Sequence, residues 1–92
     1  MVSVHAEPVG DGWLCSVKVA DRGEQTEHRV RVRPQDLERW GRGTQREDVE
    51  DLVRRSFDFL LEREPPESIL REFDLEVIRS YFPEYDREFG GG

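Results

Sequence analysis

Residues 13–32 read WLCSVKVADRGEQTEHRVRV, and this stretch decides the fold. Apolar and polar residues alternate in residues 13–20 and again in residues 27–33, which is typical of half-buried β-strands. Between the two strands, we predict a two-residue hairpin turn at Arg22-Gly23, because glycine readily adopts a positive φ. The resulting pairing gathers apolar residues on one face of the hairpin: Trp13 with Val32, Cys15 with Val30, and Val17 with His28.

A first strand is predicted in VSVHAE, residues 2–7, which alternates in the same way. The segment PVGDG that follows has turn chemistry, and we predict a four-residue loop over residues 8–11. This loop would pair Ala6 with Trp13, Val4 with Cys15 and Val2 with Val17. The opposite face of the predicted sheet is polar and carries Ser3, His5, Leu14, Ser16, Lys18, Glu27, Arg29, Arg31 and Arg33.

An apolar sheet face needs a cover, and the rest of the chain supplies helices. We predict one helix from Pro34 to Trp40 and a second that starts at a Thr44–Glu47 capping box and runs to Leu61. The core-facing stripe of the second helix has helical spacing and consists of Val49, Leu52, Val53, Ser56, Phe57, Leu60 and Leu61. Pro65 and Pro66 end the second helix, since an interior proline costs about 3 kcal/mol. We predict a short third helix from Pro66 with Ile69, Leu70 and Phe73 on its apolar side, and a fourth from an Asp74 cap through Phe82, closed by Pro83.

These elements define an α+β fold: a three-stranded antiparallel β-meander with one face covered by three to four helices. Residues 1–89 are predicted to form a single domain and residues 90–92 a disordered glycine tail. The only cysteine, Cys15, excludes an internal disulfide and suits a reducing compartment. No signal-peptide pattern follows Met1 and no apolar run approaches the roughly 20 residues of a membrane span. We therefore expect a cytoplasmic protein with no membrane partner.

The charge is unevenly distributed along the chain. Residues 1–45 carry seven basic and seven acidic side chains, whereas residues 46–92 carry seven basic and fourteen acidic ones. The second half therefore holds the whole net charge of -7. Such a chain is a poor non-specific ligand for nucleic acid or anionic lipid.

Residues 56–85, SFDFLLEREPPESILREFDLEVIRSYFPEY, resemble the corresponding part of a family of small uncharacterised bacterial proteins. A strand-to-helix step matches the same family pattern through Val30, Val32, Pro34, Asp36 and Leu37. The resemblance implies a bacterial domain of unknown function, and it carries no activity, catalytic residue or cofactor. A looser likeness in element order links the chain to small antitoxin-type domains with three strands and a helix.

Cys15 and His28 are the one thiol–imidazole combination available for nucleophilic catalysis. A catalytic pair would need an exposed thiolate and an oriented histidine, whereas the register places both residues on the apolar face. We favour a buried cysteine beside a peripheral histidine. His5 faces the other way, so a zinc site is not expected.

Two polar segments are candidate binding loops. Glu47, Asp48, Glu50 and Asp51 could hold a metal ion, but their spacing matches no calcium loop and suits a solvated helix start. Gly41-Arg42-Gly43-Thr44 lacks the Lys-Ser/Thr pair of a phosphate loop. We predict no catalytic residue, no metal site and no cofactor, and hence no enzyme.

Two groups of side chains remain as candidate contacts. Arg29, Arg31 and Arg33 alternate along a predicted edge strand and either contact nucleic acid or guard the edge against strand pairing. Tyr81, Phe82, Tyr85 and Phe89 either fold back onto the core or form an interface for a partner or a second copy. We predict a non-enzymatic protein-interaction or regulatory module, homodimeric or with an unknown partner; the alternative is an antitoxin-like, nucleic-acid-associated regulator.

Overall fold

The predicted hairpin is the centre of the computed structural model, which describes residues 1–21 and 23–90. Strands β2 (Gly12–Asp21) and β3 (Glu24–Val32) pair antiparallel, with Asp21 opposite Glu24. Gly23 has a φ of 83°, as the predicted turn requires, while Arg22 lies outside the described residues. The predicted register is confirmed at each pair: Trp13 with Val32, Cys15 with Val30, and Val17 with His28. In the same register Lys18 lies opposite Glu27.

Strand β1 (Val2–Val9) joins the other side of β2, but the predicted register is wrong by two residues. Val9 pairs with Gly12, so the turn has two residues, and Gly10 adopts a φ of 62°. The pairs are therefore Ala6 with Cys15, Val4 with Val17, and Val2 with Val19. Because side chains alternate with a period of two, a shift of two residues leaves every side chain on its predicted face.

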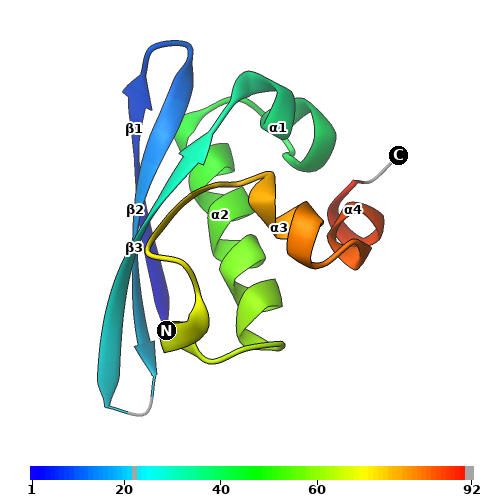
Figure 1. Ribbon diagram of the computed structural model, residues 1–92. Helices are drawn as coiled ribbons and strands as arrows, with labels where there is room; N and C mark the ends of the chain where they lie inside the picture. The colour runs from blue at the N-terminus through cyan, green and yellow to red at the C-terminus, as the bar shows by residue number, and fades with distance from the viewer. Residues whose placement is uncertain (22, 91–92) are drawn as a thin grey trace.

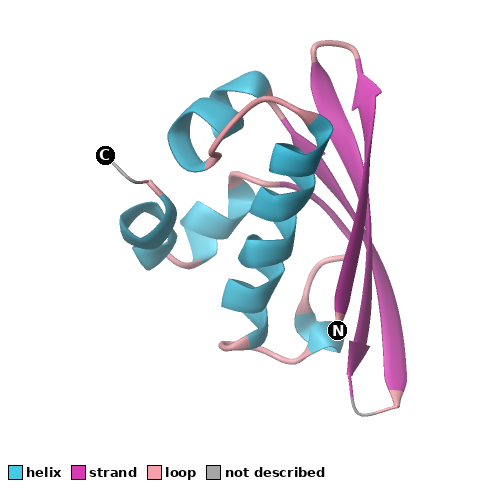
Figure 2. Ribbon diagram, turned by 180° about the vertical axis from the view of Figure 1, so that it is seen from behind, coloured by secondary structure: helices cyan, strands magenta, loops and turns pink. Residues whose placement is uncertain are grey.

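Helices α1 (Pro34–Trp40) and α2 (Arg46–Leu61) follow the meander, and all helices of the described chain lie on one side of the sheet (Figures 1 and 2). The predicted start of α2 is wrong by one residue: Asp48, rather than Glu47, accepts the cap hydrogen bond, from the backbone N–H of Gln45 at 3.0 Å. A Cβ atom on Gly43 would collide with the Asp48 carboxylate. Glycine therefore makes room for the cap at this position.

The segment after the two prolines differs from the prediction. Residues 66–73 do not form a helix: a single 3₁₀ turn, η1 (Pro66–Ser68), leads into a short strand, β4 (Glu72–Asp74). Strand β4 pairs in parallel with β3, and the sheet has four strands in the order β1-β2-β3-β4. The backbone groups on the outer side of β3 need partners, and β4 with its flanking residues supplies them, for example through a 3.0 Å hydrogen bond from the N–H of Leu75, just after β4, to the Arg31 carbonyl.

Two short helices end the fold, α3 (Val77–Tyr81) and α4 (Glu84–Phe89). Asp74 was predicted to cap one helix through Phe82, but it is the last residue of β4, and the helix begins at Val77. Pro83 follows the end of α3, as predicted, and also starts α4. Helix α4 was not predicted from the sequence. Gly90 of the predicted tail donates its N–H to the Asp86 carbonyl at 2.8 Å, and residues 91–92 lie outside the described residues.

The core has two layers because α2 is apolar on two sides. One side packs on the sheet, where Cys15, Val17, Val30 and Val32 are buried as predicted. The other side carries Phe59, outside the predicted stripe, which α4 buries through edge-on contacts with Tyr85 and Phe89. Each buried side chain of this size contributes about 1.5–3 kcal/mol, so α2 holds the sheet and the C-terminal helices together.

Candidate functional site

The predicted thiol–imidazole pair lies in the core. Cys15 has no exposed surface and His28 is 3% exposed. Burial, aided by the carboxylate of Glu50, raises the pKa of Cys15 to about 12, so its thiol carries no charge at neutral pH. The two ring nitrogens of His28 are each engaged, with the Thr26 hydroxyl at 2.9 Å and the Leu70 carbonyl at 2.8 Å. This histidine anchors the chain that leads into β4, and it has no nitrogen available to activate a nucleophile.

The acidic residues at the start of α2 have separate structural tasks. Asp48 caps the helix, and Glu50 accepts a hydrogen bond from the Ala6 N–H on the free edge of β1 at 2.9 Å. Asp51 pairs with Arg55 at 2.9 Å. In residues 1–21 and 23–90, no three His, Cys, Asp or Glu side chains converge as metal ligands. The Gly41–Thr44 loop precedes α2, and the Asp48 carboxylate already lies beside Gly43. A carboxylate of the same chain therefore occupies the space at the start of this helix.

The predicted arginine row is not on an edge strand over residues 29–31, because β4 pairs with β3 along this length. The added strand also brings carboxylates beside the arginines. Asp74 lies 3.5 Å from Arg31 and 3.3 Å from Arg33, and Glu76 lies 3.7 Å from Arg33. These ion pairs reduce the positive potential that a phosphate backbone would meet.

The four candidate aromatic residues are separated by the fold. Tyr85 is fully buried, and its hydroxyl lies 2.7 Å from the Ser56 hydroxyl. Burial raises its pKa well above the usual range. Phe89 is half-buried and stacks on Tyr85 at a centroid distance of 4.4 Å. Only Tyr81, which is 66% exposed, and the half-buried Phe82 reach a shared concave surface.

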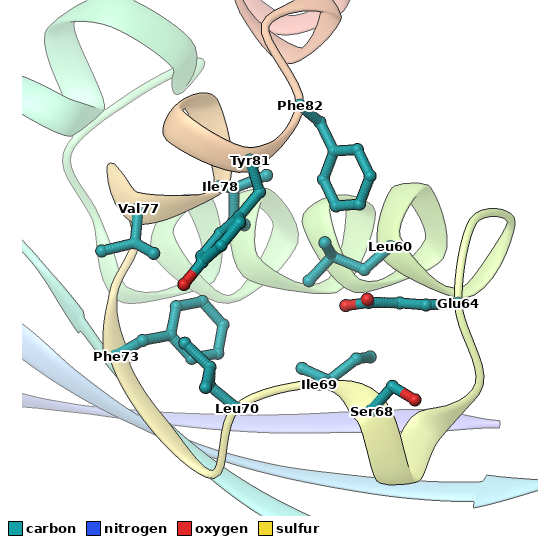
Figure 3. Close-up of a pocket in the computed structure, with 10 residues that line it drawn as sticks. All are labelled: Leu60, Glu64, Ser68, Ile69, Leu70, Phe73, Val77, Ile78, Tyr81 and Phe82. Atoms are coloured by element: carbon teal, nitrogen blue, oxygen red, sulfur yellow. The ribbon is translucent and has the colours of Figure 1, made fainter.

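That surface is an apolar pocket of about 200 Å³ between the end of α2, η1, β4 and α3 (Figure 3). Its apolar walls are Leu60, Ile69, Phe73, Val77, Ile78 and Phe82. In Figure 3, the Tyr81 ring reaches from α3 toward Phe73 and Leu70. Leu70 is 47% exposed, so this pocket has two large solvent-exposed side chains, Leu70 and Tyr81. A pocket of this kind can take one apolar side chain, since an apolar cavity of about 150 Å³ accommodates benzene.

The polar part of the pocket is acidic. Glu64, just beyond α2, lines it together with Ser68, and Figure 3 shows the Glu64 carboxylate directed between Leu60 and Ile69. Within the described ranges, this carboxylate has no hydrogen-bond or ion-pair partner. Glu64 also borders a second hollow of about 410 Å³ beside the β2–β3 turn, where the other charged lining residues are Asp21, Glu24 and Glu67. We call this second surface the acidic hollow.

The sequence analysis singled out Tyr81 and Phe82 but missed the rest of the pocket. The sequence places Leu60 in the apolar stripe of the second predicted helix and Ile69 on the apolar side of the third, and it assigns no role to Glu64. One available signal was Ile69-Leu70, which Glu67 and Ser68 separate from the prolines. In extended backbone, adjacent side chains point to opposite faces, so these two apolar side chains cannot both point into the core.

Comparisons with protein-family models, curated proteins and solved structures find no match to this chain. The predicted resemblance to the small bacterial family therefore stays a prediction. None of the helices in the described part of the chain combines the length and apolar character needed to cross a bilayer. The case for a function rests on the pocket and its surroundings.

Proposed function

We propose that this chain is a non-enzymatic interaction module that binds an apolar side chain of a partner polypeptide in the pocket between α2 and α3. One observation carries the proposal: Leu70 and Tyr81 stay 47% and 66% exposed at a concave surface with apolar walls. Exposed apolar groups at a depression are typical of interface centres. Among the described residues, the other large apolar side chains exposed to solvent are those of Met1 and Val9, and neither lines this pocket.

The chemistry around the pocket favours binding over catalysis. Its polar groups are one carboxylate, one serine hydroxyl and the Tyr81 hydroxyl, which supply no base–nucleophile pair with an orienting partner. Cys15 and His28, the pair with reactive potential, are buried elsewhere in the core. The alternative, a nucleic-acid-associated regulator acting through Arg29, Arg31 and Arg33, has weaker support because Asp74 and Glu76 pair with two of the three.

A random twelve-residue peptide library displayed on phage tests the proposal directly. We expect peptides with a shared apolar residue to be enriched on the wild-type chain. The double variant Leu70→Ser/Tyr81→Ser should lose this binding at least tenfold, because truncating interface anchors costs more than about 1 kcal/mol each. Val9→Ser is the matched control, since it removes a 57% exposed apolar side chain outside the pocket. No enrichment, or equal binding by the double variant, would refute the proposal.

A further inference from the structure

We infer that the partner is basic: the polypeptide whose apolar side chain enters the pocket carries Lys or Arg beside that side chain, and these cations contact Glu64 and the acidic hollow. This inference rests on the proposed function and names the chemistry of its partner. It is drawn from the apolar pocket and from the charges that surround it, because a group of acidic side chains alone would not define a site.

The first argument is the position of Glu64. Its carboxylate forms part of the wall of an otherwise apolar pocket, between Leu60 and Ile69 (Figure 3). An apolar ligand that fills the pocket displaces water from this carboxylate, and an uncompensated desolvated charge is costly. A ligand that combines an apolar group with an adjacent cation removes that cost. The pocket therefore selects for both features together.

The second argument is the arrangement of ion pairs. The carboxylates on α4 have arginine partners within the chain: Arg63 lies 3.2 Å from Glu84 and 3.1 Å from Glu88, and Arg79 lies 3.9 Å from Asp86. Around the acidic hollow the situation is reversed. Asp21, Glu24, Glu64 and Glu67 line it, and no basic side chain of the described residues does so. The available negative charge thus collects beside the pocket.

The third argument distinguishes a separate partner from a second copy. The pocket and most of its surroundings belong to residues 46–92, which carry the whole net charge of -7. Two such faces would repel each other on approach, whereas a basic segment would be attracted and would associate faster at low salt. The charge complementarity favours a basic polypeptide as the occupant.

The experiment extends the peptide selection. We expect enriched peptides to combine the apolar residue with Lys or Arg, and the strongest peptide, synthesised, to bind less tightly as salt rises. Glu64→Gln/Glu67→Gln should weaken its binding about three- to tenfold, as expected for partly exposed ion pairs. Glu38→Gln/Asp11→Asn changes the net charge equally at exposed positions outside the pocket and the acidic hollow, and should leave the affinity unchanged.

The outcomes separate the two proposals. Apolar enrichment without Lys or Arg, or unchanged affinity of Glu64→Gln/Glu67→Gln, would overturn the basic partner and leave the interaction module standing. If none of the enriched peptides depends on Leu70 and Tyr81 for its binding, both proposals are overturned. A concentration-dependent dimer by light scattering that Leu70→Ser/Tyr81→Ser abolishes would identify a second copy as the occupant and also overturn the basic partner.

Discussion

The guanidinium group of Arg63 lies over the ring of Phe59, 3.5 Å from the ring centre. The same side chain donates to the Phe59 carbonyl at 2.8 Å and pairs with Glu84 and Glu88 on α4. One residue just beyond α2 thereby holds α4 against the helix that carries the core. Arg63 also immediately precedes Glu64, which lines the pocket.

We expect Arg63→Met to lower the free energy of unfolding by about 1–2 kcal/mol, because it removes a cation–π contact and the hydrogen bonds of the guanidinium. Arg54→Met is the control, since Arg54 makes an exposed pair with Asp51 at 3.3 Å and should cost less than about 0.5 kcal/mol. Urea unfolding followed by tryptophan fluorescence measures both. Equal losses in the two variants would show that Arg63 does not fasten α4.

Tyr85→Phe tests the buried hydroxyl pair that joins α4 to α2. The Ser56 hydroxyl lies 2.7 Å from both the Tyr85 hydroxyl and the Leu52 carbonyl. Removing the tyrosine hydroxyl should cost about 1 kcal/mol, the net value of one hydrogen bond. Tyr81→Phe is the matched control, because Tyr81 is largely exposed, and it should leave the urea midpoint unchanged. A Tyr85→Phe midpoint equal to that of the wild type would contradict this account.

Asp36 should make stability depend on pH. Burial raises the pKa of its carboxyl above the ordinary value of 3.8 and Glu76 adds to the rise, while the backbone N–H of Arg33 and the guanidinium groups of Arg33 and Arg39 oppose it. The folded state therefore holds this proton more tightly than the unfolded state. The free energy of unfolding falls as the pH rises from about 3.8 through the raised pKa, where a charged carboxylate becomes buried.

Asp36→Asn removes this effect while its amide oxygen can still accept the 2.9 Å hydrogen bond from the Arg33 N–H. We expect the variant to gain stability relative to the wild type as the pH increases from acidic to neutral values, because the wild-type carboxyl then loses its proton while buried. Urea unfolding of both proteins at several pH values measures the difference between their free energies of unfolding. The contributions of the other carboxylates are common to both proteins and cancel in this difference. Parallel curves would contradict a raised pKa.

Cys15 should be inert toward thiol reagents in the folded protein. Its pKa of about 12 and its lack of exposed surface leave neither thiolate nor access. We expect labelling by a chromogenic disulfide reagent at pH 8 to be at least a hundredfold slower than labelling in urea. Labelling in native buffer at the unfolded rate would show that the sheet face opens, and the buried assignment of Cys15 and His28 would then be wrong.

The sequence by itself determined the β2–β3 hairpin, its register and the core-facing side of α2. These features are local: a two-residue turn sets the pairing, and the alternation of side chains allows only one face to be buried. Even the two-residue error at β1 left each side chain on its predicted face, since a strand repeats with a period of two. The placement of Cys15 and His28 on the apolar face followed from the same local rule, but His28 is buried rather than peripheral as predicted.

Only the tertiary structure decided the path of residues 66–89. Ile69, Leu70 and Phe73 have helical spacing, yet the segment forms β4 because the outer backbone groups of β3 require partners that periodicity does not reveal. The fold likewise buried Tyr85 and left Tyr81 in water, although both rings belong to one aromatic run. The pocket exists only where α2, η1, β4 and α3 meet, so no single stretch of sequence encodes it.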